Sequence, residues 1–121
     1  MRVAGLGFRA LADVASLRDA LQLAGGTTGL TALATAEDKA NAPALIRLAA
    51  DLGLPVIAIG LATLSSQAAT PSAHGPKRYG AHSLAEAAAK AAAGPGARLV
   101  TARAVSTDKM ATAAIAENTN P

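Results

Sequence analysis

The sequence predicts a single three-layer α/β/α domain over residues 1–121, with a mostly parallel sheet that ends in an antiparallel hairpin. Three observations predict this class. Strand-like apolar runs alternate with segments of helical periodicity from residue 3 to residue 59, and the connections are short. Two later strand-like runs, 98–105 and 111–116, are joined by a short polar turn. The chain of 121 residues is long enough for one hydrophobic core but not for two.

The first strand is expected at 3–10, where an apolar run contains two glycines and continues into an arginine. A helix is expected to begin at Ser16, because the apolar residues at 17, 20, 21 and 24 share one helical face. Asp19 follows Ser16 at the spacing of a capping box, and glycines at 25 and 26 end the helix.

The second strand is expected within 27–36, and the charged residues 37–39 follow it. The second helix begins near Asn41 with Pro43 in its first turn, where the missing N–H costs nothing, and it ends at Gly53. The third strand, 55–59, is almost entirely apolar, so we expect both of its faces to be buried.

Residues 65–80 are rich in Ser, Pro and Gly and show no periodicity. Such a segment is either a flexible insertion or a loop that orders over a ligand. A third helix is expected from Ser83 through an alanine-rich stretch to Gly94. The two hairpin strands complete the sheet, and residues 117–121 are expected to be frayed.

Composition excludes several classes of protein. Only 2% of the residues are aromatic, which argues against modules that stack single-stranded nucleic acid on aromatic side chains. The net charge of +3 comes from dispersed basic residues, which suit either a polyanionic small molecule or an ordinary solvated surface. The absence of cysteine excludes disulfides and thiolate chemistry.

No metal or cofactor is expected. The two histidines, His74 and His82, do not have a metal-ligand spacing and have no soft ligand near them in the sequence. The longest apolar run, 52–64, is interrupted by Pro55 and two glycines and is too short to span a bilayer. We therefore expect a cytoplasmic protein without a membrane segment.

The first candidate binding residues are Gly5, Gly7 and Arg9, at the end of the first strand. Glycines let a ligand approach the backbone, and an arginine offers a planar fork of donors to carboxylate or phosphate. The alternative is a simple tight turn. The spacing also fits the dinucleotide-binding fingerprint, but the acidic ribose partner expected about twenty residues later is missing, so a nucleotide site is disfavoured.

Lys39 and Glu86 are two further candidate binding residues, and each also has a purely structural explanation. Lys39 follows the second strand as Arg9 follows the first, and ligands of open α/β sheets bind beyond these strand ends. It could instead pair with Glu37 or Asp38 on the surface. Glu86 follows Ser83 at the spacing of a capping box, which explains it without any binding role.

These residues together resemble the CobE/CbiG C-terminal domain family of cobalamin biosynthesis, over nearly the whole chain. The similarity rests on the motifs with Gly5, Gly7 and Arg9, with Lys39, with the Leu-Gly-Leu-Pro turn at 52–55, with Thr70 and Ser72, with the Gly-x-x-Ser-x-x-Glu-Ala-Ala segment at 80–88, and with the strand at 111–116. Many relatives have a lysine where this chain has Arg103, which keeps the charge but not a deprotonable amine. The chain looks most similar to the stand-alone CobE form.

The resemblance implies a protein that binds a corrinoid or precorrin intermediate, as an accessory or carrier protein, with other enzymes of the pathway as possible partners. The substrate-binding residues that it implies are Gly5, Gly7, Arg9, Lys39, Thr70, Ser72, Glu86 and Arg103. Late corrinoid precursors carry many carboxylates, which cations at one sheet rim can bind by charge-assisted hydrogen bonds. The alternative is a hydrolase that acts on a precorrin lactone, with Glu86 or Lys39 transferring a proton, so the sequence leaves open whether the protein is an enzyme.

Overall fold

A five-stranded sheet forms the centre of the protein, and its order is β3-β2-β1-β5-β4. The computed structural model describes residues 1–66 and 84–118. The strands are Arg2–Phe8 (β1), Ala32–Ala36 (β2), Val56–Ile59 (β3), Arg98–Val105 (β4) and Ala111–Glu117 (β5). β1, β2 and β3 are parallel, whereas β5 is antiparallel to both of its neighbours, β1 and β4. The predicted parallel sheet with a C-terminal hairpin is confirmed.

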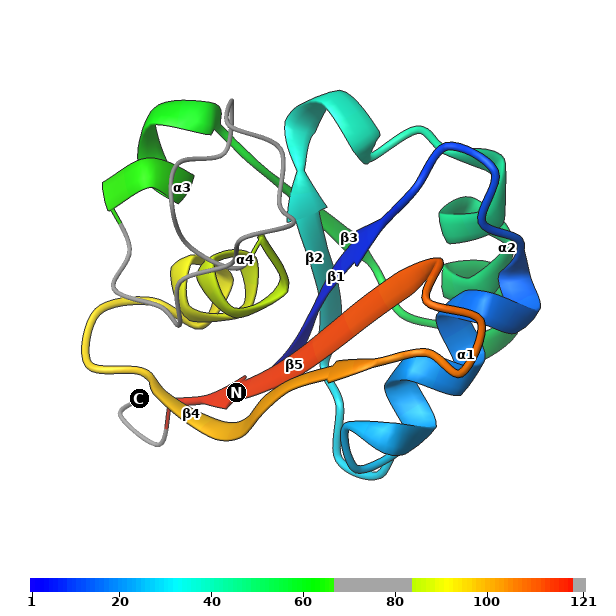
Figure 1. Cartoon of the computed structure of the whole chain (residues 1–121). Helices are drawn as coiled ribbons and strands as arrows, with labels where there is room; N and C mark the ends of the chain where they lie inside the picture. Colours follow the sequence, from blue (N-terminus) through cyan, green and yellow to red (C-terminus); the bar gives the residue numbers. More distant parts are fainter. Residues whose placement is uncertain (67–83, 119–121) are drawn as a thin grey trace.

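Helices cover both faces of this sheet (Figure 1). The helices α1 (Val14–Leu23) and α2 (Pro43–Leu52) lie on one side, and α3 (Leu61–Ser66) and α4 (Leu84–Ala93) lie on the other. A single 3₁₀ turn, η1 (Glu37–Lys39), follows β2. The three-layer α/β/α architecture predicted from the sequence is therefore present.

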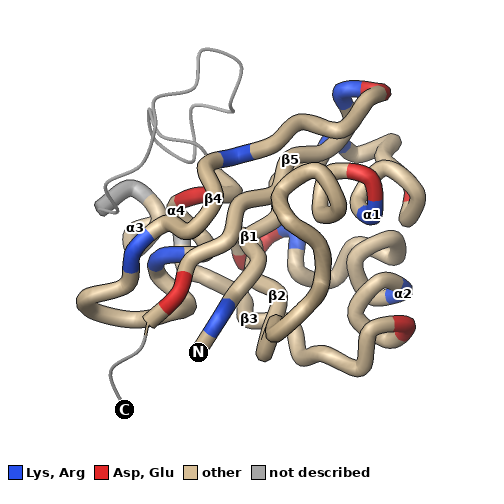
Figure 2. Tube along the Cα trace, turned by 90° about the horizontal axis from the view of Figure 1, so that it is seen from below, with Lys and Arg blue, Asp and Glu red and all other residues tan. Residues whose placement is uncertain are grey.

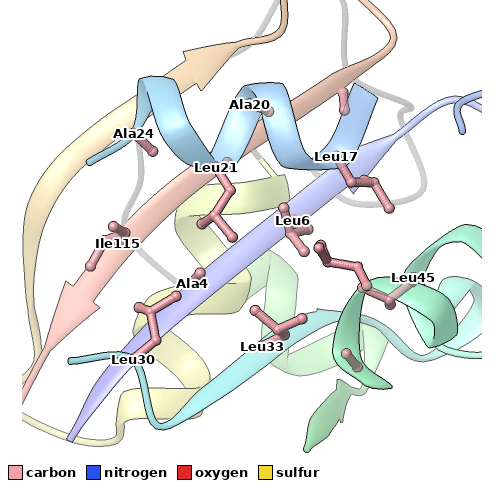
Figure 3. Packing of buried hydrophobic residues seen from close by; sticks show 14 residues of the cluster. Ala4, Leu6, Leu17, Ala20, Leu21, Ala24, Leu30, Leu33, Leu45 and Ile115 are labelled. Carbon is pink, nitrogen blue, oxygen red and sulfur yellow. The ribbon is translucent and has the colours of Figure 1, made fainter. Parts of the chain in front are cut away.

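The core differs in character between the two faces. Branched side chains fill the space under α1 and α2, where Leu17 and Leu21 of α1 face Leu6 on β1 and Ile115 on β5 (Figure 3). The opposite face is dominated by alanines of α4 and of the sheet. Small side chains allow a helix and a sheet to approach closely, so α4 lies nearer to the strands than larger residues would permit.

The predicted start of the first helix is wrong. α1 begins at Val14, and its N-cap is Asp13, whose side chain accepts a hydrogen bond from the Ser16 N–H at 2.9 Å. Asp19 makes no capping box with Ser16; its carboxylate accepts a hydrogen bond from Thr107 N–H at 2.6 Å, in the turn between β4 and β5. The tertiary contact with this turn replaces the local contact that the spacing indicated.

Three other features differ from expectation: the start of β2, the presence of a short helix and the burial of β3. β2 starts only at Ala32, because Gly29 has a positive φ of 77° that no strand adopts. The short helix α3 was not expected. β3 is an edge strand with an exposed Ala58, so the expectation that both faces are buried is wrong. Val56 and Ile57 are half-buried, and Ile59 is buried.

The end of the chain is ordered further than expected. Glu117, predicted as frayed, is the last residue of β5 and pairs with Arg2 at 3.1 Å. The Asn118 side chain donates hydrogen bonds to Ala93 O at 3.0 Å and to Pro95 O at 2.9 Å, which ties the end of β5 to the end of α4. Residues 119–121, like most of the segment 65–80, lie outside the described residues.

Candidate functional site

The carboxyl ends of β1 and β2 bring two cationic residues next to each other. Lys39, in η1 directly after β2, donates a hydrogen bond from its Nζ to Phe8 O at 2.6 Å. The same Nζ lies 5.0 Å from the centre of the Phe8 ring, within the range of a cation–π contact. Phe8 is the last residue of β1 and directly precedes Arg9. The Lys39 ammonium therefore lies beside the peptide bond that joins Phe8 to Arg9.

Arg9 itself is exposed, but its backbone is held in place. Its N–H donates to Met110 O at 2.9 Å, and its carbonyl accepts from Ala12 N–H at 3.0 Å. Among the residues that the structure describes, no carboxylate forms an ion pair with the guanidinium. The five donors of Arg9 are thus available to a ligand from solvent.

Gly7 lies where α4 begins. A Cβ at this position would come within 2.9 Å of Thr112 Oγ1 and 3.5 Å of Leu84 Cβ, so the backbone of β1 closely approaches the first residue of the helix. The described start of α4 therefore lies beside the end of β1. We call Gly7, Arg9, Lys39 and the first turn of α4 the rim site.

Gly5 lies away from this rim, beneath α4. A Cβ here would stand 1.9 Å from Ala85 O and 2.6 Å from Ala89 N. Both are backbone atoms of the helix, so the glycine is required for the close packing of α4 on β1. The structure thus gives Gly5 a packing role, which the sequence pattern alone did not distinguish from close approach of a ligand.

Glu86 and Arg103 contact each other. Glu86 is fully buried, and its Oε2 accepts a hydrogen bond from Arg103 N–H at 3.2 Å. The pairing of β4 with β5 is irregular between Leu99 and Ala104, which leaves a backbone donor of β4 for the helix carboxylate. Ser83, the other half of the expected capping box, lies outside the described residues. Glu86 therefore connects α4 to the edge strand, a contact that the capping-box interpretation does not include.

The eight predicted site residues thus fall into separate groups. Lys39 contacts Phe8, the residue between Gly7 and Arg9. Glu86 accepts a hydrogen bond from the backbone N–H of Arg103, and Gly5 packs against α4. Thr70 and Ser72 lie outside the part of the chain that the structure describes, as do His74 and His82. Sequence reasoning missed Phe8 and Thr112, and nothing in their local sequence distinguishes them from other strand residues.

Other features of the described residues do not compete with the rim site. One open hollow is lined by Met1, Arg2, Thr28, Gly29, Thr31 and Glu117, and another by residues 90–97 at the end of α4. Neither contains a residue of the rim site. In the same part of the chain, no three His, Cys, Asp or Glu side chains gather as they would around a metal ion, and none of the helices combines the length and apolar character needed to cross a bilayer.

The charges are distributed as the sequence indicated. Figure 2 shows basic and acidic residues interspersed over the chain rather than gathered in one basic block. On α1 and α2, Asp51 pairs with both Arg18 and Arg47. The cations of α1 and α2 are therefore partly neutralised, in contrast to Arg9.

Comparison with known proteins identifies the family of this chain. Residues 2–116 match the family model described as cobalamin synthesis G C-terminus. The solved structure of CobE, a protein from the cobalamin (vitamin B12) biosynthetic pathway, is 33% identical and superimposes with a TM-score of 0.78 over 98% of this chain and 90% of that one. Cobalamin biosynthesis protein chiG from Agrobacterium tumefaciens is 34% identical, with a TM-score of 0.73 over 99% of this chain and 100% of that one.

A cobalamin biosynthesis protein G homolog from Sulfolobus solfataricus shares the fold at 14% identity, with a TM-score of 0.71 over 95% of this chain and 36% of that longer one. A search of the curated proteins finds no significant match. The family match covers almost the entire chain. The protein therefore belongs to the cobalamin synthesis G C-terminus family, a family of cobalamin biosynthesis.

Proposed function

We propose that the protein binds a polycarboxylated corrinoid or precorrin intermediate of cobalamin biosynthesis at the rim site, as an accessory or carrier protein. The observation that supports this proposal is the contact of Lys39 Nζ with Phe8 O at 2.6 Å, because Phe8 directly precedes the exposed Arg9. In a family of cobalamin biosynthesis, a cationic rim of this kind fits a ligand whose periphery carries several carboxylates.

Arg9 and Lys39 have distinct roles in this proposal. The exposed guanidinium of Arg9 forms bidentate hydrogen bonds with a ligand carboxylate. Lys39 donates to Phe8 O, and its positive charge attracts a second carboxylate from a partly buried position. Gly7 and the first turn of α4 form the floor against which the macrocycle lies, and Arg103 adds positive charge from β4.

Glu86 supports the site in this proposal without touching the ligand. It is fully buried and bonded to the backbone of Arg103. The alternative function, hydrolysis of a precorrin lactone, would need Glu86 or Lys39 to exchange a proton with the substrate.

A visible-absorbance titration with a metal-free corrinoid such as hydrogenobyrinic acid tests the proposal, because corrinoids report their own environment. We expect a saturable shift that weakens as salt is raised, with the ligand recovered unaltered by mass analysis. Arg9→Ala and Lys39→Ala should each weaken binding about tenfold, the loss of one charge-assisted hydrogen bond.

Arg47→Ala is the matched control. It removes one positive charge from the exposed surface of α2, where Arg47 lies 3.7 Å from Asp51. We expect its affinity for the corrinoid to equal that of the unmodified protein. Equal losses in all three variants would mean that net charge alone drives binding, and unchanged affinity in Arg9→Ala and Lys39→Ala would refute the rim site. A changed ligand mass would favour the hydrolase.

A further inference from the structure

A polar cluster lies beside the rim site, between the β4–β5 turn and the start of α1. Its centre is Asp108, whose Oδ1 accepts from Ser106 Oγ at 2.6 Å and from Met110 N–H at 3.0 Å, and whose Oδ2 accepts from Ser16 Oγ at 2.5 Å. Ser16 and Ser106 are almost fully buried. We call Asp13, Ser16, Ser106, Asp108 and Met110 the Asp108 cluster. Neither the family match nor the motifs single it out.

The cluster holds both ends of the loop that carries Arg9. At one end, Arg9 N–H donates to the carbonyl of Met110, and the N–H of the same Met110 is held by Asp108. At the other end, Asp13 caps α1 by accepting from the N–H of Ser16 at 2.9 Å, and the hydroxyl of Ser16 contacts Asp108. The short loop between β1 and α1 is therefore clamped between two elements that Asp108 joins.

Other roles for this cluster fit the contacts less well. Two carboxylates, Asp13 and Asp108, flank the Ser16 hydroxyl, but within the described residues they are not joined by a third metal-ligating side chain. Ser16 is buried and its hydroxyl is engaged, which leaves it unsuited to act as a nucleophile. What the contacts do explain is a fixed position for the backbone of Arg9.

We propose that Asp108 is a positioning residue for ligand binding, which acts through Met110 and Ser16 to hold the Arg9 loop at the rim site. This inference rests on the proposed function. A guanidinium on a fixed backbone loses less conformational freedom when it binds a carboxylate than one on a loose loop. The hydrogen bonds from Ser106 and Ser16 hold the pKa of Asp108 below its ordinary value of 3.8, so the carboxylate is the acceptor that the cluster needs at neutral pH.

A double-mutant cycle of Asp108→Ala with Arg9→Ala tests whether Asp108 acts through Arg9. We expect Asp108→Ala to weaken binding of hydrogenobyrinic acid about fivefold in the unmodified protein and to have no effect when Arg9 is already alanine. Asp108→Asn keeps one acceptor oxygen and should recover part of the loss. Asp51→Ala removes the same charge from the α1–α2 surface and should leave the affinity unchanged, because Asp51 contacts only Arg18 and Arg47 among the described residues.

A second readout does not depend on the ligand. Because Arg9 N–H is bonded to Met110 O, its hydrogen exchange should become at least about tenfold faster in Asp108→Ala, while the amides of Val3 and Leu6 inside β1 stay protected. An equal loss of affinity in both backgrounds, or unchanged exchange at Arg9, would overturn the inference. If the unmodified protein binds no corrinoid, the proposed function fails and the ligand-binding part of this inference fails with it. Faster exchange at Arg9 would then still show that Asp108 holds the loop.

Discussion

Gly5 of β1 lies so close to Ala85 of α4 that no side chain fits between them. A Cβ at residue 5 would stand 1.9 Å from the Ala85 carbonyl oxygen, and the backbone nitrogen of Ala89 is also within contact. Backbone atoms cannot rotate away as a side chain can, so α4 would have to move off the sheet. The packing of α4, and with it the floor of the rim site, depends on this glycine.

Gly5→Ala is therefore expected to lower the free energy of unfolding by about 3 kcal/mol or more, as overpacking does in a tight core. Urea denaturation of the variant measures this loss. Gly60→Ala is the matched control, because a Cβ at residue 60 would meet no heavy atom of the described residues within 4 Å. We expect the control to change stability by less than about 0.5 kcal/mol. Equal stability of the two variants would contradict the close packing of α4 on β1.

The buried carboxylate of Glu86 leads to a second prediction, which separates its acceptor role from its charge. Glu86→Gln keeps an oxygen that can accept from Arg103 N–H and should lower stability by about 1 kcal/mol. Glu86→Ala leaves that N–H without its acceptor and opens a cavity in a fully buried position, so we expect a loss of about 3 kcal/mol. Thermal and urea unfolding of both variants give the two values.

The same pair of variants bears on function. If Glu86 only supports the site, Glu86→Gln should bind a corrinoid almost as well as the unmodified protein. A loss of lactone turnover in a well-folded Glu86→Gln variant would instead indicate a proton-transfer role.

The sequence predicted the class of fold and the position of Lys39 at the same sheet edge as Arg9 for reasons that are local or topological. Arg98–Val105 forms β4 as expected, because its β-branched residues and the flanking glycine and polar turn are neighbours in the sequence. Lys39, after β2, contacts the end of β1 because the carboxyl ends of adjacent parallel strands lie at one edge of a sheet. Neither inference required knowledge of distant contacts.

The N-cap of α1, the role of Gly5 and the partner of Glu86 depend on long-range contacts, which the local sequence does not reveal. Asp13 and Ser16 are both residues that cap helices, and Ser16 is not the cap because its hydroxyl contacts Asp108, 92 residues further along the chain. Gly5 looks the same in the sequence whether a ligand or a helix approaches it. Glu86 accepts a hydrogen bond from the backbone N–H of Arg103, in a part of β4 where the pairing with β5 is irregular. The local sequence does not predict such an irregularity in strand pairing.

Lys39 provides a third prediction, which separates its structural contact from its contact with a ligand. Lys39→Met keeps the apolar stem and removes the ammonium, so Phe8 O loses a partly buried charge-assisted hydrogen bond. We expect a loss of stability of about 1 kcal/mol by urea denaturation. An unchanged stability would show that the contact with Phe8 contributes no net stabilisation.

The fourth prediction concerns acid stability and follows from the direction of the Asp108 pKa shift. Hydrogen bonds from Ser106, then from Ser16 and from Met110 N–H, hold the pKa of Asp108 below 3.8 in the folded protein. A folded-state pKa below the unfolded value means that the ionised carboxylate stabilises the fold above the unfolded pKa. That contribution is lost as the pH falls through 3.8 toward the lowered value.

Asp108→Asn should therefore be less stable than the unmodified protein at neutral pH, and the difference should shrink as the pH falls through this window. Urea denaturation at a series of pH values from 7 to 3 measures both effects. Ser106→Ala tests the cause, because it removes the donor that lowers the pKa most. A carbon-13 NMR titration of the Asp108 carboxyl should then show its midpoint moving up toward 3.8. Parallel stability curves for Asp108→Asn and the unmodified protein, or an unmoved midpoint in Ser106→Ala, would mean that the carboxylate is not the centre of the cluster. Protonation must weaken an ionised acceptor that holds the turn to α1, because it removes the charge that strengthens these hydrogen bonds.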